Sequence, residues 1–365
     1  MQDKAFSLLR SALWQIPCHE SITDSDWVHI MHFMRKQALD GIIPDALALM
    51  TSSPQRTKVK MRMIGRQLLV ERANLKMNEE LISFTKELEK KNIPHVLLKG
   101  QGIGTLYPFP QHRVSGDIDL YVPKDYIRRV NDGLLAFGGK RGEENRHHID
   151  YSVNGILWEL HHCIFYFQKD SRNIRFMQYV DEALKDKPVY VNVGCGNVRV
   201  LPPTTNVLLL LSHILDHFYC QGIGLRQLCD LAILLDKEHD NINPQKLQDS
   251  LKELALERCY RIFGYICVKY IGLAFEKLMI KPTKSDEQLA HKIIKDCIQG
   301  GNFGRNAHSG RKTFLNWISY YTRFILRLIK FYELNPSEAL WWPLAKLKRL
   351  FTGTIIIRKE KSVLN

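Results

Sequence analysis

Closely spaced cysteine pairs are absent from the sequence, although the chain contains eight cysteines. None of them forms a Cys-x-x-Cys motif, and their scattered positions match neither a zinc site nor a disulfide framework. The chain also lacks an apolar run near the roughly 20 residues that a membrane-spanning helix needs. Its first residues do not combine a basic start with a long apolar core, as a signal peptide would. We therefore expect reduced cysteines and a cytoplasmic protein with no transmembrane segment.

Internal repeats and low-complexity segments are missing as well, and acidic residues are outnumbered by basic ones. The 365 residues are 45% hydrophobic and 25% charged, which is typical of a soluble globular chain long enough for two domains. The formal net charge is +14, and from residue 311 onward 11 Lys and Arg accompany 3 Glu. Such a basic segment attracts polyanions or acidic membrane surfaces, or it only keeps the protein soluble.

Hydrophobic periodicity divides the chain into three predicted domains. Residues 1–88 are predicted to be helical, and their longest helix runs on to about residue 91. Residues 89–202 combine short strands with a helix, and residues 203–365 are again helical and end in a basic tail. Within this last part, helices are predicted over 206–218, 251–273, 286–299 and 314–334. The predicted fold class is α+β, with a small mixed sheet flanked by N-terminal and C-terminal helical regions.

The stretch Val96–Val122 concentrates the chemistry of the chain. It begins with an apolar run that ends in Lys99-Gly100, continues through a Gly- and Pro-containing loop, and finishes as Asp-Ile-Asp-Leu-Tyr-Val. Side chains of a strand alternate between its faces, so Asp117 and Asp119 share one face while the Ile and Leu between and after them point into a core. Two carboxylates this close repel each other unless a cation lies between them. Mg²⁺ is the usual cation because it binds carboxylates and substrate phosphates together.

The loop before the two aspartates has the composition of a phosphate-binding loop. Glycines let backbone N–H groups approach phosphate oxygens, and Lys and Arg neutralise a triphosphate. The predicted nucleotide and phosphate contacts are Lys99, Gly100, Gly102, Arg113, Ser115 and Gly116. A bare Asp-x-Asp is more often an acidic strand end beside a loop. Together with this loop, however, it predicts a site for metal-dependent phosphoryl or nucleotidyl transfer.

Asn154-Gly155 lies between two apolar-rich segments and is the strongest short signal for a β-hairpin. In the strand that follows, Leu157, Glu159 and His161 fall on one face. A lone carboxylate among apolar strand residues is costly, so Glu159 is a candidate third metal ligand that helps to deprotonate an acceptor. The alternative is a surface glutamate on an edge strand. His161 either orients a phosphate or the acceptor, or is only a hydrogen-bonded neighbour.

Histidines elsewhere do not predict a zinc site. The triplet His161-His162-Cys163 lies on a strand, where adjacent side chains point to opposite faces and cannot easily bind one ion. His213 and His217 are spaced i, i+4 on a helix but lack the glutamate that zinc proteases place after the first histidine. We expect them to be polar positions beside the cleft. Arg226 and Asp230 share a helix face, so Arg226 either reaches the substrate or forms a salt bridge.

These motifs resemble those of the nucleotidyltransferase superfamily that includes DNA polymerase beta, the CCA-adding enzymes and the antibiotic nucleotidyltransferases. The sequence is most similar to a bacterial group often labelled uncharacterised nucleotidyltransferase. That group carries Leu-Lys-Gly, then Arg, Asp-Ile-Asp-Leu, an acid followed by Leu-His, and a Leu-Arg…Asp helix. The sequence departs from the wider superfamily at residues 99–102, where Lys-Gly-Gln-Gly replaces the usual Gly-Gly or Gly-Ser, and in its long loop.

The resemblance implies an enzyme in which Asp117, Asp119 and Glu159 hold Mg²⁺ or Mn²⁺ and an NTP loses pyrophosphate to an acceptor hydroxyl. His161 and Arg226 would be substrate contacts. The acceptor, the base of the NTP and the oligomeric state stay open. One alternative is a catalytically idle nucleotide-binding module that serves a partner protein. A less favoured one is a nucleic-acid binder that uses residues 311–365.

Overall fold

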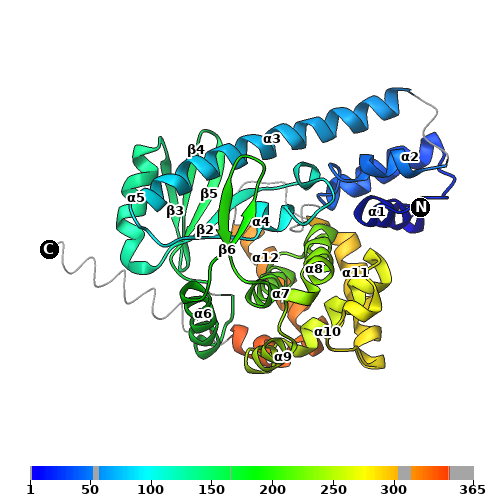
Figure 1. The fold of residues 1–365 in the computed structure, drawn as a ribbon. Coiled ribbons are helices and arrows are strands. Elements are labelled where there is room, and N and C mark those ends of the chain that lie inside the picture. The colour runs from blue at the N-terminus through cyan, green and yellow to red at the C-terminus, as the bar shows by residue number, and fades with distance from the viewer. Residues whose placement is uncertain (1, 52–56, 165, 303–313, 344, 346–365) are drawn as a thin grey trace.

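Figure 1 shows the computed structural model of the chain, which describes all residues except 1, 52–56, 165, 303–313, 344 and 346–365. A seven-stranded mixed sheet forms one part of the molecule. The long helix α3 (Thr57–Lys90) crosses this sheet and extends to the N-terminal helices, while the C-terminal helices pack on the other side of the sheet (Figure 1). The predicted fold class, a mixed sheet with helical flanks, is confirmed.

The segment before the sheet is helical, as predicted. Its elements are α1 (Gln2–Trp14), α2 (Asp24–Lys36), the 3₁₀ helix η1 (Ile43–Leu49) and α3. A capping box begins α2, because the Thr23 hydroxyl accepts the Asp26 N–H while the Asp26 carboxylate accepts the Thr23 N–H. A single apolar core joins α1 and α2 to the C-terminal helices. The division into three domains at residues 88 and 202 stays a prediction.

The strands are arranged in the order β3-β4-β5-β2-β1-β7-β6. They are β1 (Val96–Leu98), β2 (Asp117–Tyr121), β3 (Lys140–Glu144), β4 (His148–Val153), β5 (Ile156–His161), β6 (Val189–Asn192) and β7 (Asn197–Val200). The pairs β2–β5 and β1–β7 are parallel, and the other neighbours are antiparallel. The predicted hairpin is confirmed, since Asn154 and Gly155 both have positive φ, as a type I′ turn requires.

The two faces of the sheet have different partners. Ile118, Leu120 and Trp158 belong to an apolar core formed with α3 and with α5 (Ile127–Ala136). The acidic side chains of β2 and β5 point to the opposite face, toward α7 (Pro203–Cys220) and α8 (Leu225–Lys237). The period-two alternation predicted for β2 is therefore confirmed, and it leaves one polar face directed at the helical part of the chain.

The remaining helices are α6 (Asp170–Lys185), α9 (Pro244–Glu253), α10 (Glu257–Ile266), the π turn η5 (Cys267–Ile271), α11 (Lys284–Gly300) and α12 (Phe314–Lys330). The prediction of one helix over 251–273 is wrong, because the chain turns between α9 and α10. Ala255 has a φ of 54°, and the Leu256 N–H bonds to the carbonyl of Leu251 at 2.7 Å. Leu254 and Leu256, on either side of Ala255, are fully buried. The apolar pattern therefore continues through the turn, and no Gly or Pro in the sequence indicates that the helix ends there.

Other differences lie in the α/β part. The sequence predicts a loop directly after Lys99, whereas residues Gly100–Gly104 form the short helix α4. Helix α6 and the edge strand β3 are not among the elements predicted from the sequence. All five residues of β3 are exposed, and its Lys-Arg-Gly-Glu-Glu sequence has no apolar alternation. An edge strand without a buried face gives no hydrophobic signal.

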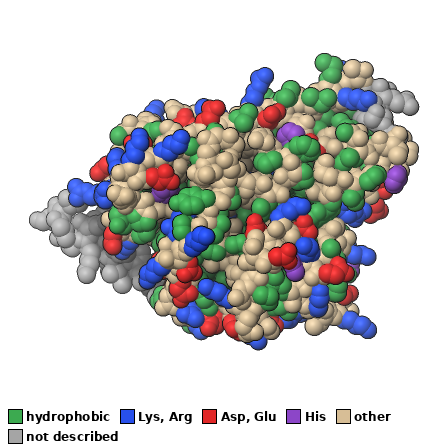
Figure 2. Space-filling model, viewed as in Figure 1, with side chains coloured by type: hydrophobic (Ala, Val, Ile, Leu, Met, Phe, Trp, Pro, Cys, Tyr) green, Lys and Arg blue, Asp and Glu red, His purple; other side chains and the backbone are tan. Residues whose placement is uncertain are grey.

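Charges are mixed on the face of the molecule that Figure 2 shows. On the face shown in Figure 2, Lys and Arg side chains are interspersed with Asp and Glu among the residues coloured by type. Within the basic segment predicted from the sequence, residues 311–313, 344 and 346–365 lie outside the described residues. Of the helices that the structure describes, none has both the length and the apolar character needed to cross a bilayer.

Candidate active site

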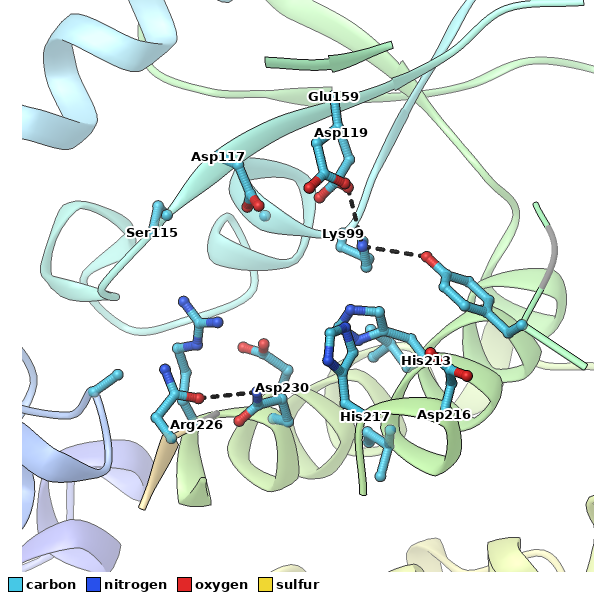
Figure 3. Close-up of a pocket in the computed structure, with 18 of the residues that line it drawn as sticks. Lys99, Ser115, Asp117, Asp119, Glu159, His213, Asp216, His217, Arg226 and Asp230 are labelled. Atoms are coloured by element: carbon cyan, nitrogen blue, oxygen red, sulfur yellow. Dashed lines mark hydrogen bonds and ion pairs between the residues drawn. The ribbon is translucent and has the colours of Figure 1, made fainter. Parts of the chain in front are cut away.

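A cavity of about 410 Å³ lies between the polar face of the sheet and helices α7 and α8 (Figure 3). This volume is in the range of small-molecule sites. The predicted site residues that line it are Lys99, Gly100, Arg113, Ser115, Gly116, Asp117, Asp119, Glu159, His161 and Arg226. Gly102 is not among them. It packs against the core instead, where an added Cβ would lie 3.0 Å from Cγ1 of Val200.

Three carboxylates converge from two neighbouring strands (Figure 3). Asp117 and Asp119 project from β2, and Glu159 of β5 lies beside Asp119 in the parallel register. Asp119 is only 3% exposed, and its Oδ1 lies 3.0 Å from Lys99 Nζ and 2.9 Å from His161 Nε2. The structure thus places all three acids on one face and gives Asp119 two nitrogen partners.

The two aspartates differ in their electrostatics. Burial and the neighbouring Asp119 carboxylate raise the pKa of Asp117 to about 6. Burial also opposes the ionisation of Asp119, but Lys99 and His161 outweigh it and hold the pKa of that carboxyl below its ordinary value. Among the described residues, none gives the Asp117 carboxylate a hydrogen bond or an ion pair. Lys99 and Arg226 act on this carboxylate only from a distance, and an oxygen-rich donor set with one such unbonded carboxylate fits a hard divalent cation such as Mg²⁺.

Lys99 sits in a strained turn between β1 and α4. Its φ of 51° and ψ of −142° define a conformation that costs a residue with a side chain about 1–3 kcal/mol. Its buried Nζ reaches Asp119 and donates a hydrogen bond to the Tyr166 hydroxyl at 3.3 Å. Burial disfavours the ammonium, but the negative charge of Asp119 prevails and raises the pKa of Lys99. The cavity therefore contains a permanently charged ammonium beside the acids.

Arg113 makes contacts that differ from the prediction. Its Nε and Nη2 donate to Oδ1 and Oδ2 of Asp230, each at 2.7 Å, and both residues are buried. The Tyr107 hydroxyl donates to the same carboxylate at 2.7 Å. The sequence predicts a phosphate contact for Arg113, but its guanidinium bonds to Asp230 instead. The salt bridge between Arg226 and Asp230 that the sequence allows within α8 is therefore replaced by the pair of Asp230 with Arg113. Arg226 Nη1 donates to the Val114 carbonyl at 2.9 Å. Helix α8 thus holds the loop that leads into β2.

Histidines are more numerous in the cavity than the sequence analysis suggests. His147 and His148 line it beside His161, and His213 and His217 line it from α7, as expected for polar positions beside the cleft. The rings of His213 and His217 lie 4.2 Å apart and face the acids of the sheet across the cavity (Figure 3). Burial lowers the pKa of His213 and brings the pKa of His217 to about 3. Both rings are consequently neutral at pH 7.

Comparison with known proteins finds a crystal structure of an antigenic nucleotidyltransferase-like protein from Paracoccidioides brasiliensis. The two chains are 17% identical, and the alignment covers 58% of this chain and 97% of the other, with a TM-score of 0.32. A superposition at that level does not establish a shared fold. No curated protein has significant sequence similarity to this chain.

A family match covers residues 23–272, which is more than half of the chain. The matched region contains Lys99, both aspartates of β2 and Glu159, together with helices α7 and α8 that close the cavity. It agrees with the resemblance carried by the Lys-Gly, Asp-x-Asp and Glu-Leu-His motifs. The chain belongs to the family described as uncharacterised nucleotidyltransferase.

Proposed function

We propose that this protein is a Mg²⁺-dependent nucleotidyltransferase that moves a nucleoside monophosphate from an NTP to an acceptor hydroxyl and releases pyrophosphate. The observation that carries the proposal is the convergence of Asp117, Asp119 and Glu159 on one face of the sheet, at a cavity that also contains the Lys99 ammonium. Membership of the family supports nucleotidyl transfer as the class of reaction.

The acids have separate parts in this proposal. Asp117, Asp119 and Glu159 would hold Mg²⁺, or Mn²⁺ in its place, which when bound neutralises the triphosphate and supports in-line displacement at the α-phosphorus. Asp117 contributes a carboxylate that has no direct hydrogen bond or ion pair among the described residues, and Lys99 and His161 keep Asp119 ionised. Glu159 lies beside Asp119 on the side of β4, where its carboxylate can accept the proton of the acceptor hydroxyl.

The other cavity residues would bind the phosphates. Lys99 and Arg226 supply positive charge, while Gly100, Ser115 and Gly116 line the wall next to Asp117. Arg113 contributes indirectly, because its bonds to Asp230 fix the loop that leads into β2. His161 donates to Asp119, which favours a supporting position over a direct substrate contact.

Isothermal titration of ATP and GTP with and without Mg²⁺ tests the proposal. At least one nucleotide should bind with Mg²⁺, and binding should weaken roughly tenfold or more without the metal or in Asp119→Asn, because a lost charged contact is worth about 1.5–3 kcal/mol. Asp125→Asn is the matched control, since Asp125 is exposed and does not line the cavity. If neither the removal of Mg²⁺ nor the Asp119→Asn substitution changed the nucleotide affinity, the proposal would be wrong.

Mg²⁺ affinity should depend on pH because Asp117 must be ionised to bind the metal. With the pKa of Asp117 at about 6, the metal has to displace a proton below that pH. We expect Mg²⁺ to bind about tenfold more weakly at pH 5 than at pH 7, with little change above pH 7, since one pH unit below the pKa corresponds to about one factor of ten. Mn²⁺ titrations followed by electron paramagnetic resonance, with circular dichroism to confirm folding at each pH, measure this. A constant affinity over that range would contradict it.

The catalytically idle nucleotide-binding module is the second candidate. The contact between Lys99 Nζ and Asp119 favours it, because an ammonium neutralises a carboxylate that the metal would otherwise use. Pyrophosphate release from ATP and GTP in a deproteinised metabolite extract separates the two candidates. An active enzyme will release pyrophosphate, and a binding module will not.

A further inference from the structure

A second group of potential metal ligands lies beside the three acids, on the hairpin of β4 and β5. His148 pairs with His161 across the hairpin, and Asp150 pairs with Glu159. Cross-strand partners point to the same face of a sheet, so these four side chains form one block. The two-residue turn Asn154-Gly155 fixes that register.

Three atoms of the block have the spacing of a metal site. His148 Nδ1 lies 3.5 Å from Glu159 Oε2, and His161 Nε2 lies 3.3 Å from the same oxygen. All three atoms lie within 4.8 Å of one another. Ligands bound at about 2.1 Å to a tetrahedral ion are about 3.4 Å apart. Two of the three separations therefore already match those of a tetrahedral ion.

His148 is also oriented as a metal ligand would be. Its Nδ1 is buried and has no hydrogen-bond partner among the described residues. Its Nε2 lies 3.1 Å from Oδ1 of Asp150 and 2.6 Å from Nδ2 of Asn145. A metal-bound histidine usually presents its second nitrogen to a carboxylate, which fixes the ring and its tautomer. If an ion were bound through Nδ1, the ring would carry its proton on Nε2, where the Asp150 carboxylate lies close enough to accept it.

We propose that His148, Glu159 and His161 form a site for a transition-metal ion of the Zn²⁺ and Co²⁺ class. The inference rests on the proposed function and refines it, because Glu159 is the acceptor-side carboxylate. Imidazole nitrogen suits these ions, whereas Mg²⁺ prefers oxygen alone. The two sides of the active site would thus take ions of different chemistry, with oxygen ligands at Asp117 and Asp119 and mixed ligands at the hairpin.

The hairpin site has the composition of a reactive metal site. It offers three protein ligands, and a tetrahedral ion with three protein ligands keeps one open position, as in catalytic zinc sites. All three residues line the cavity, so this position is accessible to a small molecule. His161 links the two sites, because its Nε2 would have to release its hydrogen bond to Asp119 Oδ1, at 2.9 Å, in order to bind the ion.

Co²⁺ titration of the tag-free, full-length protein without nucleotide, followed by visible absorption, tests the site. One equivalent of Co²⁺ should give the intense bands of tetrahedral coordination, Zn²⁺ should abolish them, and excess Mg²⁺ should not. His148→Ala should weaken Co²⁺ binding by roughly a hundredfold or more, and Asp150→Asn by about 10–100-fold as a second-sphere change. His162→Ala is the matched control, because this neighbouring histidine is outside the ligand set and should bind Co²⁺ like wild type.

Equal Co²⁺ affinity in wild type and in both β4 variants, with folding verified by circular dichroism, would overturn the site. Loss of the bands in excess Mg²⁺ would overturn it too, by placing Co²⁺ on the oxygen ligands of β2. Asp117→Asn separates this inference from the proposed function, because it removes an oxygen ligand and leaves the hairpin intact. Co²⁺ bands without any nucleotide binding would count against the proposed function alone.

Discussion

Replacing Asp117 with asparagine is expected to abolish nucleotidyl transfer and at the same time to make the folded protein more stable. Loss of a metal-binding carboxylate removes several kcal/mol of transition-state stabilisation, so pyrophosphate release should fall by about three orders of magnitude. The pKa of about 6 means that the ionised carboxylate is unfavourable in the folded state without metal. Because one pKa unit corresponds to about 1.4 kcal/mol and the pKa of Asp117 is raised from 3.8 to about 6, the gain in free energy of unfolding should be on the order of 3 kcal/mol at neutral pH.

The raised pKa of Asp117 determines how the stability difference between wild type and Asp117→Asn changes with pH. Residue 117 of the unfolded wild type loses its proton near the ordinary value of 3.8, whereas the folded protein keeps it until about 6. The contribution of Asp117 to stability therefore declines as pH rises through this window. Asparagine at residue 117 does not titrate in this range. The gain in free energy of unfolding of Asp117→Asn over wild type should therefore be absent below about pH 4 and complete above about pH 6.

Urea denaturation in EDTA at several pH values across this window measures the stability difference, and a pyrophosphate assay measures the reaction. Asp125→Asn again serves as the control, because an exposed carboxylate outside the cavity should change neither quantity. A variant that is less stable than wild type at neutral pH, or that still releases pyrophosphate at the wild-type rate, would contradict the assignment of Asp117.

Replacing Arg113 with methionine is expected to cost about 3–5 kcal/mol of folding free energy, because it leaves the buried Asp230 carboxylate without its cation. The two residues share two bonds of 2.7 Å, and each is about 95% buried, with 4% and 5% of its surface exposed. Burial raises the cost of ionising Asp230, and the Arg113 guanidinium prevails and lowers the pKa of that carboxyl. The Tyr107 hydroxyl alone cannot replace the lost charge.

A double variant completes the test of the Arg113–Asp230 pair. Arg113→Met with Asp230→Leu should recover most of the loss, since an apolar pair of similar volume avoids the isolated charge. Urea denaturation of both single variants and the double variant measures the coupling. If Arg113→Met instead retained wild-type stability and lost nucleotide binding, Arg113 would act directly on the phosphates, as the sequence first suggests.

Local patterns in the sequence are sufficient to predict the strands that carry the acids. The alternation in Asp-Ile-Asp-Leu and the Asn-Gly turn follow from rules that act over a few residues. The same turn also predicts that His148 and Asp150 lie beside His161 and Glu159, because a two-residue loop fixes the pairing by counting outward. His148 and Asp150 carry no motif of their own, so only this pairing count points to them.

Contacts between distant parts of the chain could not be predicted in the same way. Arg113 and Asp230 are 117 residues apart, and nothing in either local sequence indicates that helix α8 packs on the loop before β2. The turn at Ala255 shows a related difficulty, because buried leucines on both sides of it continue the apolar pattern of the helices. In both places tertiary packing decides the structure, and local propensity does not reveal it.

The cavity has two walls of separate origin, with the acids on the sheet and His213, Asp216 and His217 on helix α7. The acids of the sheet and the side chains of the helix can therefore change independently of each other during evolution. A lineage could exchange the α7 side chains to accept a new small molecule while it keeps the three carboxylates of the sheet. Engineers seeking altered selectivity should accordingly randomise the helix and leave the strands untouched.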